Sequence, residues 1–324
     1  MRDVFGRFLS VAIILLATRI AAAQQTIPHA QDRPPGPPLS PAEALKKMKA
    51  PPGFQVELVA AEPDLVNPVA MTFDERGRIW VTESLEYPRS EPGPGRDRVK
   101  ILEDTDHDGQ VDKVTVFAEG LNIPSGIAVG YGGVWVANSP DLLFMQDTDG
   151  DGKADKSEVV VTGFGRTDTH ELPNSLTWGP DGWLYGLNGS TTTCRIRGLE
   201  FQQGVWRYHP VTKDFELFCE GGGNVFGLTF DRVGRLLYSA NAGLVWHGIQ
   251  GAYYEKNFGK HGPLDNLYAY GFFKNVTHHG QTGRPNTGAT IYLGDTFPAP
   301  FRDAFLCGDF LSHTCSWWSL EPQG

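Results

Sequence analysis

Two acidic stretches of this sequence have the composition and spacing of a loop that binds a hard cation. Residues 104–113 read DTDHDGQVDK, and residues 147–156 nearly repeat them as DTDGDGKADK. Carboxylates at alternate positions can surround one cation, and the glycine permits the sharp bend that brings them together. The sequence therefore predicts a calcium site in each stretch.

The second stretch matches the calcium-loop pattern in full, and the first matches it in part. The ligands predicted in the second loop are Asp147, Asp149, Asp151, Asp155 and Glu158. Those predicted in the first loop are Asp104, Asp106, Asp108 and Asp112. Thr115 stands where the first loop should have its distal glutamate, so we expect a weaker site there. The alternative for both stretches is an Asp-Gly hairpin turn that needs no metal.

A second kind of chemistry is suggested by the stretch THELPNSLTWGPDGWLYG, which starts at Thr169. His170 lies there in a polar loop, with Asp168 and Glu171 close by in the sequence. A histidine can take up a proton near neutral pH, and a neighbouring carboxylate can orient its ring. We therefore predict that His170 is a general base. The alternative is a surface histidine that bonds only to its own loop.

An internal repeat indicates which elements must position these residues. Four segments share an alternating apolar strand, a glycine turn and a second strand, and their turn glycines are Gly77, Gly132, Gly182 and Gly234. A period of about fifty residues made of short strands is typical of a β-propeller, in which each repeat is one four-stranded blade. The predicted fold class is therefore all-β, with blade cores at Val69–Val81, Ile127–Val136, Leu176–Tyr185 and Leu228–Tyr238.

The number of blades follows less directly from the sequence. A fifth set of strands is expected near residues 289–320, after a stretch at 243–288 that is rich in Gly, His and Tyr. Either five blades close on a strand around Phe54–Val59, or the chain holds about five blades of a six-bladed ring. We favour the six-bladed type. The two acidic loops then lie at hairpin tips within blades, away from the central channel.

Asparagines recur where each repeat enters its first strand. Asn67, Asn122 and Asn224 each stand ten residues before their turn glycine, and the third repeat has His170 and Asn174 around that position. In a propeller these entry segments ring one mouth of the channel, where ligands usually bind. The alternative is local, since an asparagine before a strand often bonds its own backbone.

The first residues are expected to direct export. Residues 1–23 combine two arginines, an apolar run over 8–17 and three alanines before Gln24, which is the pattern of a secretory signal peptide. No other stretch approaches transmembrane length. We therefore predict a periplasmic or extracellular protein. Residues 24–52 are expected to be a Pro-rich linker with a short helix after Ser40, and residues 53–324 to be the propeller domain.

Charge and cysteine content narrow the partners further. The formal net charge is −10, which argues against nucleic acid or an anionic membrane as a partner. Cys194, Cys219, Cys307 and Cys315 permit three full pairings, and none forms the CxxCH pattern of an attached haem. Of these, Cys307 and Cys315 are expected to be disulfide partners rather than nucleophiles.

Longer stretches resemble a known family. GFQVELVAAEPDLVNPVAMTFDERGRIWVTE, the two acidic loops and THELPNSLTWGPDGWLYGLNG resemble the domain described as a membrane-bound dehydrogenase in Planctomycetes and Verrucomicrobia. The resemblance extends from about Pro51 to the C-terminus. That domain is similar in turn to the glucose/sorbosone dehydrogenases, six-bladed propellers that use pyrroloquinoline quinone (PQQ) and calcium. The resemblance implies an exported oxidoreductase that acts on a sugar or related alcohol, with an electron-accepting cytochrome as a possible partner.

The resemblance also assigns roles to particular residues. In those dehydrogenases a histidine before a GPDGxLY strand takes the hydroxyl proton of the substrate, and His170 matches it with one extra residue before the strand. Their RNPxGLxFD motif supplies an Arg and an Asn near the cofactor. Here the motif reads GNVFGLTFD, so Asn224 matches and Gly223 replaces the Arg. We expect Asn224 and Asn174 to contact the cofactor.

Two other functions remain open at this point. One is a non-catalytic propeller, stabilised by calcium, that binds carbohydrate or protein. The other is a calcium-dependent, lactonase-like hydrolase that uses the ring of asparagines as metal ligands. The hydrolase is disfavoured because no acidic residue occupies the equivalent position of the repeat.

Overall fold

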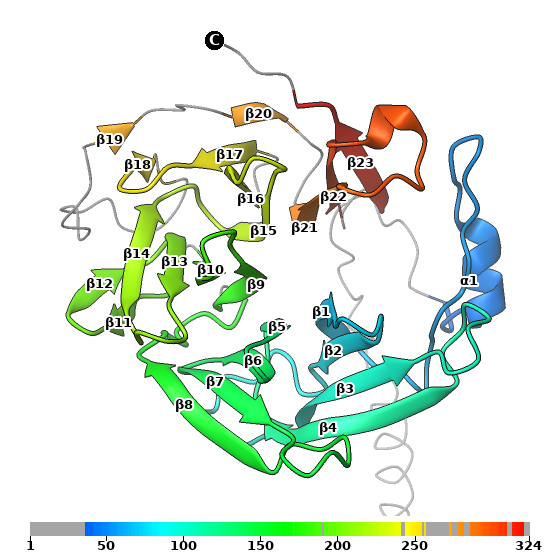
Figure 1. The fold of residues 1–324 in the computed structure, drawn as a ribbon, viewed down its shortest axis with the longest axis horizontal. Coiled ribbons are helices and arrows are strands. Elements are labelled where there is room, and N and C mark those ends of the chain that lie inside the picture. Colours follow the sequence, from blue (N-terminus) through cyan, green and yellow to red (C-terminus); the bar gives the residue numbers. More distant parts are fainter. Residues whose placement is uncertain are drawn as a thin grey trace, which may run out of the picture. The chain divides into compact units, whose positions relative to one another are not determined.

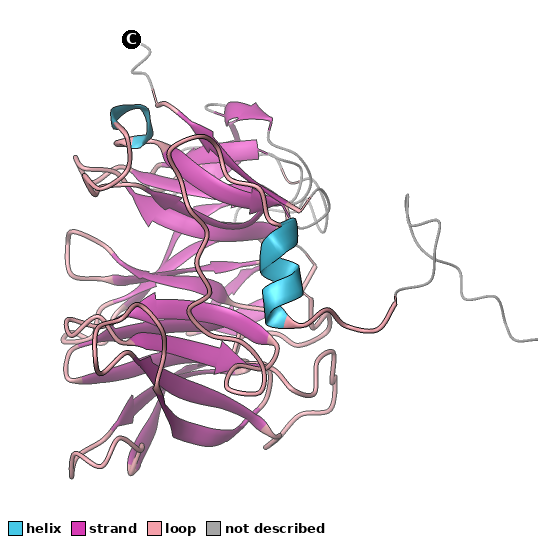
Figure 2. Cartoon of the chain, turned by 90° about the vertical axis from the view of Figure 1, so that its right-hand side faces the viewer, coloured by secondary structure: helices cyan, strands magenta, loops and turns pink. Residues whose placement is uncertain are grey.

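The computed structural model describes residues 36–170, 172–189, 191–240, 244–254, 256, 272–273, 278–281, 286–309 and 313–320. Strands make up nearly all of the regular structure in these residues (Figure 2). The predicted signal peptide, residues 1–23, and much of 243–288 lie outside the described residues. The chain divides into two compact units, Met1–Glu57 and Leu58–Gly324.

The first unit contains the predicted helix, α1 (Pro41–Lys47). Glu43 accepts hydrogen bonds from both the backbone nitrogen and the hydroxyl of Ser40, at 3.0 and 2.6 Å, so the expected capping residues define its start. Pro41 suits the first helical position because an N–H there would have no partner within the helix. Among the described residues, no helix is long and apolar enough to cross a membrane.

The second unit is built from antiparallel sheets that follow one another along the chain (Figure 1). The strands of the first sheet are β1 (Pro68–Phe73), β2 (Ile79–Glu83), β3 (Asp97–Glu103) and β4 (Lys113–Leu121). Those of the second are β5 (Gly126–Gly130), β6 (Gly133–Asn138), β7 (Asp141–Gln146) and β8 (Lys156–Thr162). In both sheets the strands lie in chain order, which is the pattern of a propeller blade.

The third sheet is larger than a simple blade. Its strands are β9 (Asn174–Trp178), β10 (Leu184–Asn188), β13 (Gly204–Tyr208), β14 (Phe215–Glu220), β18 (Tyr253–Tyr254) and β19 (Phe272–Phe273). The last two are added parallel at the outer edge. A separate hairpin between β10 and β13 consists of β11 (Cys194–Ile196) and β12 (Leu199–Phe201).

Two further sheets complete the described series. The fourth contains β15 (Val225–Phe230), β16 (Leu236–Ala240), β17 (Leu244–Gly248) and β20 (His278–Gln281). The fifth contains β21 (Asn286–Ile291), β22 (Phe305–Asp309) and β23 (Thr314–Trp318), with the short helix η1 (Ala299–Phe301) between the first two. The fifth sheet therefore falls within the predicted range 289–320, apart from the start of β21.

Contacts between sheets establish the propeller. The first strands of successive sheets, β1, β5, β9, β15 and β21, each contact the next one in chain order. The structure is therefore a β-propeller with five blades in the described residues, which confirms the predicted fold class. The four predicted blade cores fall on the inner hairpins β1–β2, β5–β6, β9–β10 and β15–β16.

The repeated turn glycines have a conformational reason. Gly77, Gly132, Gly182 and Gly234 have φ angles of 79°, 77°, 80° and 83°. This left-handed region disfavours residues with a Cβ atom, so each inner hairpin reverses direction at a glycine. The fifty-residue period in the sequence therefore reflects a left-handed turn position that recurs once in each of these four hairpins.

Large aromatic side chains fill the spaces between blades. Trp135 of β6 and Trp206 of β13 lie in one buried cluster shared by the second and third blades. Tyr238 and Trp246 lie in a second cluster, shared by the third and fourth blades. Each ring contributes substantial apolar burial, so these clusters hold neighbouring sheets face to face.

One blade face departs from this pattern. Ala70 of β1 packs into the core that the first and second blades share. The alternate residues Val69, Met71 and Phe73 point to the other face of β1 and are 45, 57 and 61% exposed. The alternative of a closing strand at Phe54–Val59 is not realised, because those residues form no strand.

The cysteines correct one expectation. All four lie in described residues, and no disulfide joins any of them. In the β22–β23 register, Cys307 is opposite Ser316 and Cys315 is opposite Gly308. Side chains alternate along a strand, so Cys307 and Cys315 point to opposite faces of the sheet. The expected pairing of these two residues is therefore wrong.

A buried aspartate organises the first inner turn. Asp74 accepts hydrogen bonds from the backbone nitrogens of Arg76 and Arg78 at 2.9 and 3.0 Å. It also accepts from the Arg78 guanidinium and the Trp80 indole, at 2.7 and 2.9 Å. Burial opposes ionisation, but the hydrogen bonds from Trp80 and Arg78 outweigh it and lower the pKa of Asp74. Asp231 makes the corresponding contacts in the fourth blade.

We predict that Asp74→Ala lowers the free energy of unfolding by about 2–3 kcal/mol at neutral pH, because it leaves several donors unpaired. Since the folded pKa of Asp74 is below its ordinary value, its contribution is complete above about pH 4 and is lost as the pH falls through the folded pKa. Urea unfolding of both proteins from neutral pH to about pH 3 measures this, and the difference between them should shrink on acidification.

A matched control is Glu200→Ala. Glu200 pairs with Arg195 at 2.9 Å, but the two side chains are 48 and 69% exposed, so the loss should stay below about 1 kcal/mol. If the Asp74 variant loses no more stability than this control at neutral pH, the turn does not depend on the carboxylate.

Candidate functional site

The two acidic loops join the outer strands of the first two blades. Residues 104–112 connect β3 to β4, and residues 147–155 connect β7 to β8, as the hairpin interpretation predicted. In the first loop, carboxylate oxygens of Asp104, Asp106 and Asp108 lie within 4.8 Å of one another. The corresponding oxygens of the second loop meet the same limit and come from Asp147, Asp149 and Asp151. Each loop therefore brings three predicted ligands together.

Backbone hydrogen bonds hold both loops in the same conformation. Asp147 accepts from the nitrogens of Gly150 and Gly152 at 2.7 and 2.8 Å. Asp104 likewise accepts from Gly109 at 2.8 Å. These first aspartates therefore shape the turn whether or not a cation is present. Asp149 accepts from the backbone nitrogen of Asp151 at 3.2 Å.

The remaining predicted ligands lie outside the two clusters. Asp155 accepts from the hydroxyl of Thr148 at 2.7 Å, and Asp112 accepts from that of Thr105 at the same distance. Both residues close the base of their loop. Glu158 lies within β8, opposite Phe144. Burial raises the pKa of the Tyr208 phenol in the third blade; the charge of Arg197 opposes this rise, and that of Glu158 adds to it.

Each acidic loop also docks on the element before its own blade. The backbone nitrogen of Ala154 donates to the carbonyl of Phe117 in β4 at 2.8 Å. The nitrogen of Val111, at the same position of the first loop, donates to the carbonyl of Val59 at 3.0 Å. The loops therefore belong to the joints between neighbouring elements as well as to their own hairpins.

His170 and Asp168 form a pair in the loop that leads to β9. The Nδ1 atom of His170 lies 2.8 Å from Oδ1 of Asp168, which also accepts from the His170 backbone nitrogen at 2.9 Å. Partial burial opposes ionisation, but these bonds lower the pKa of Asp168. An ionised carboxylate only accepts, so Nδ1 carries a proton, and in the neutral form of the imidazole the lone pair is on Nε2. The His170 side chain is 64% exposed, which leaves it accessible to a ligand.

Neighbouring groups fix this pair in place. The Tyr87 ring meets the His170 ring edge-on, with centroids 5.5 Å apart. The Thr192 hydroxyl lies 3.2 Å from the backbone nitrogen of Asp168 and 3.1 Å from its carbonyl. On the other side, the Thr169 hydroxyl donates to the carbonyl of Pro88 at 3.3 Å. The loop is thus attached to the first blade and to its own blade.

Arg166 is a functional candidate that the sequence interpretation missed. Its guanidinium donates to the carbonyl of Ser139 at 2.7 Å and to the side-chain oxygen of Asn122 at 2.9 Å. It also reaches the carbonyls of Asn122 and Arg89, both at 3.3 Å. Burial and the nearby charge of Arg89 lower its pKa, and Asp97 opposes them. Arg166 thereby connects loops of three blades, four residues before His170.

A sequence signal for Arg166 did exist. It is the only Lys or Arg between Lys156 and Arg195, and it lies in a Gly-rich loop. A single cation in such a segment often has a specific partner, but the partners here are backbone carbonyls of other blades. No local pattern encodes those contacts.

Three of the four predicted mouth asparagines use their amides to hold backbone. Asn67 donates to the carbonyl of Ser84. Asn122 donates to the carbonyls of Glu91 and Gly93 at 2.8 and 2.9 Å. Asn174 is 2% exposed and donates to the carbonyls of Leu172 and Val225 at 3.0 and 3.1 Å.

These contacts bear on the expected cofactor contact of Asn174 and on the alternative of a metal-dependent hydrolase. Asn174 joins the third and fourth blades through Val225, and its side-chain oxygen accepts from the Ser175 hydroxyl at 2.8 Å. Both functional groups of its amide are therefore engaged within the fold. A hydrolase that used the ring of asparagines as metal ligands would need these oxygens to face the channel together. The oxygens of Asn122 and Asn174 instead accept from Arg166 and Ser175, which argues against that function.

Asn224 differs from the other three. Its side-chain oxygen is buried and has no hydrogen-bond partner in the described structure. It follows three consecutive glycines, Gly221, Gly222 and Gly223, whose φ angles are 108°, 105° and 106°. An arginine at position 223 would be strained in this conformation, which gives a backbone reason for the departure from the family motif. The orphan oxygen is available to a donor on a ligand.

A buried ion pair lies just before these glycines. Lys256 donates to Glu220 at 2.5 Å, and the two side chains are 5 and 0% exposed. Burial opposes the charge of Lys256, but the bond to Glu220 outweighs it and raises the pKa. The lysine charge is therefore neutralised by Glu220.

Solved structures share this fold. A proposed oxidoreductase (glucose dehydrogenase) from Thermus thermophilus has 16% identity and a TM-score of 0.55 over 80% of each chain. The PQQ-bound form of aldose sugar dehydrogenase from Streptomyces coelicolor has 14% identity and a TM-score of 0.50, over 79% of this chain and 78% of that one.

The calcium structure of Carbohydrate-Active Enzymes Family AA12 from Trichoderma reesei has 14% identity and a TM-score of 0.52, over 80% of this chain and 81% of the other. At such identities the likeness shows a common propeller fold, and it confirms the relation to sugar dehydrogenase propellers at that level.

No curated protein sequence gives a significant match. The model of one family, described as Domain of unknown function (DUF7133), matches residues 40–324. This chain therefore belongs to the DUF7133 family.

Proposed function

We propose that this chain is a quinoprotein-type dehydrogenase that oxidises a sugar or related alcohol at the mouth where the loops enter β9 and β15. The observation that carries the proposal is the pair formed by His170 and Asp168, with its 2.8 Å contact. The pair belongs to a loop attached to two blades, and its imidazole is exposed. Such a group is positioned to take a proton from a hydroxyl.

The chemistry of the pair follows from its protonation. Asp168 accepts the Nδ1 proton of His170, so the Nε2 lone pair is directed away from the carboxylate. When Nε2 takes a proton from a substrate hydroxyl, the imidazolium that forms is stabilised by the adjacent carboxylate. Tyr87 restricts rotation of the imidazole through its edge-on contact. Loss of the hydroxyl proton favours release of hydride from the same carbon.

The hydride requires an acceptor, which we propose to be PQQ, and the quinone would supply that acceptor when bound. The chain offers one group that fits such a ligand, the buried side-chain oxygen of Asn224 that has no partner in the described structure. Gly223 provides no side-chain charge, and Lys256 is neutralised by Glu220. Binding near Asn224 would therefore depend on hydrogen bonds more than on charge among the described residues.

Calcium is proposed as a structural ion of the two acidic loops. The carboxylate clusters lie at the tips of the outer hairpins β3–β4 and β7–β8, whereas His170 and Asn224 precede the inner strands β9 and β15. A cation in either loop would therefore stabilise a hairpin and the joint beside it. It would take no direct part in the oxidation.

Export and electron transfer complete the proposal. The signal-peptide pattern of residues 1–23 supports a periplasmic or extracellular location. Electrons from the reduced quinone would pass to an acceptor such as a cytochrome. The negative charge of the chain would favour a basic acceptor.

We predict that calcium raises the melting temperature and that Asp149→Ala and Asp106→Ala remove most of this effect. These two aspartates suit the test because, within the described residues, each accepts one long backbone bond, at 3.2 and 3.3 Å, so the turn should persist without them. Sites of this extracellular kind have dissociation constants of roughly 10⁻⁴ to 10⁻³ M. At about ten times that concentration, one site adds about 1.4 kcal/mol.

Thermal unfolding in calcium and in a chelator measures this effect. Asp214→Ala is the matched control, since Asp214 is exposed in the β13–β14 turn and its carboxylate accepts from the Thr212 hydroxyl at 2.6 Å. Its response to calcium should equal that of the unmodified protein. If both loop variants keep the full response, the loops are ordinary turns.

We predict that His170→Asn lowers dye-linked oxidation of an aldose or alcohol by about 10²–10⁴-fold, because a positioned base is lost. The protein is loaded with PQQ and calcium, and rates are measured over a panel of sugars and alcohols. His107→Asn is the control, because His107 lies in the first acidic loop and should leave the rate unchanged.

Two outcomes would contradict this proposal. One is equal activity in the two histidine variants, which removes His170 from the reaction. The other is a lack of both quinone binding, followed by its absorbance, and oxidation of every substrate in the panel. The non-catalytic binding function would then replace the dehydrogenase.

A further inference from the structure

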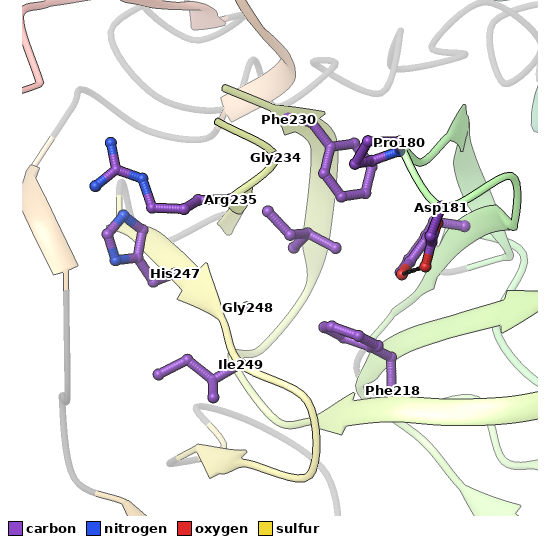
Figure 3. A pocket seen from close by; sticks show the side chains of 11 residues that line it. Pro180, Asp181, Phe218, Phe230, Gly234, Arg235, His247, Gly248 and Ile249 are labelled. Carbon is purple, nitrogen blue, oxygen red and sulfur yellow. Dashed lines mark hydrogen bonds between the residues drawn. The ribbon is translucent and has the colours of Figure 1, made fainter. Parts of the chain in front are cut away.

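A pocket of about 400 Å³ lies between the third and fourth blades, away from the mouth (Figure 3). Pro180 and Asp181 come from the β9–β10 turn, and Gly234 and Arg235 from the β15–β16 turn. These turns are at the opposite ends of β9 and β15 from the loops that carry His170 and Asn224. The pocket is therefore separate from the proposed oxidation site.

Aromatic rings form one wall of the pocket. Tyr185 contacts Phe218 and Phe230 edge-on, with ring centroids 5.3 and 5.1 Å apart. Phe218 and Phe230 are only partly buried, and both line the pocket. Leu236 and Ile249 add aliphatic surface. This wall suits a ligand with an extended C–H face.

Polar groups are placed around this apolar wall. Figure 3 shows Arg235 and His247 on one side of the pocket and Asp181 with Phe218 on the other. Asp231 accepts from the Nε atom of Arg235 at 2.5 Å, which holds the guanidinium in place. Its two terminal amino groups make no hydrogen bond in the described part of the chain. The pocket therefore presents donors at one end and a carboxylate at the other.

The charged side chains near the pocket pair with one another. Arg207 pairs with Asp181 and Glu216 at 3.1 and 2.6 Å, and Arg235 pairs with Asp231. Burial raises the pKa of Tyr185 to about 12, so its hydroxyl stays protonated and donates to Asp181 at 2.8 Å. With two guanidinium groups against three carboxylates, the site has no excess positive charge to attract an anion. Asp181 is already neutralised by its own partners.

We propose that this pocket binds a neutral sugar ring. The C–H face of a pyranose would lie against Phe218 and Phe230, and its hydroxyls would bond to Arg235 and Asp181. Hydroxyls both donate and accept, so they match a site that offers donors and acceptors without net positive charge. A purely apolar ligand would leave those polar groups unpaired. The volume is in the usual range for small-ligand sites.

Saturation-transfer NMR and calorimetry on the full chain with methyl glycosides of glucose, galactose, mannose and xylose test the proposal. At least one glycoside should bind, and Arg235→Met and Phe218→Leu should each weaken its affinity about tenfold or more, equivalent to one lost hydrogen bond or stacking contact. The control is Arg232→Met, because Arg232 lies in the same turn but pairs with Asp303 outside the pocket. The control should bind like the unmodified protein, and circular dichroism verifies the fold of each variant.

The site is distinguished from the mouth by His170→Asn, which should retain full glycoside binding here even where oxidation is lost. Failure of the dehydrogenase assay would leave this proposal intact. Three results would overturn it: no glycoside binds, indole binds while every glycoside fails, or glycoside affinity falls in the His170 variant and not in the Arg235 variant.

Discussion

A strand-paired sheet with two apolar faces must cover both of them, and this requirement underlies the whole propeller. Between the second and third blades the cover comes from rings such as Trp135 and Trp206, which are almost fully buried. Because each sheet is held by its neighbours, the loops at the inner strand ends have fixed starting points. The bonds from Arg166 to Asn122 and from Asn174 to Val225 then tie adjacent loops together. These hydrogen bonds between loops, together with the packed blades, position His170.

The fold was predictable because its determinants are local and repeated. Glycines with φ near 80° recur in the inner hairpins of the first four blades, so a backbone requirement appears directly as a sequence period. The acidic hairpin tips were equally readable, since three aspartates and a glycine in six residues act within one turn. The capping residues Ser40 and Glu43 defined the start of α1 for the same reason.

The candidate site was less predictable because its contacts connect distant segments. Asn67, Asn122, Asn174 and Asn224 take similar positions in the repeat, yet the first three donate to backbone carbonyls, and of the four only Asn224 has a buried side-chain oxygen without a partner. Asn224 follows three glycines, but that local pattern does not show that its side-chain oxygen lacks a partner. Arg166 and Tyr87 were missed because their partners lie in other blades. The expected disulfide between Cys307 and Cys315 was wrong because the pairing of β22 with β23 places the two side chains on opposite faces of the sheet.

The docking of the acidic loops has a consequence for how the repeats diverge. Both joints, Ala154 to Phe117 and Val111 to Val59, are made between a backbone nitrogen and a backbone carbonyl. Such a bond does not depend on which side chains the two residues carry. Residues beside it can therefore be substituted without moving one element relative to the next. At these two joints, a change of side chain on one element then needs no matching change on the other, unlike at the aromatic clusters between blades. These joints can therefore persist while the side chains around them change, and solved structures share this fold at 14–16% identity.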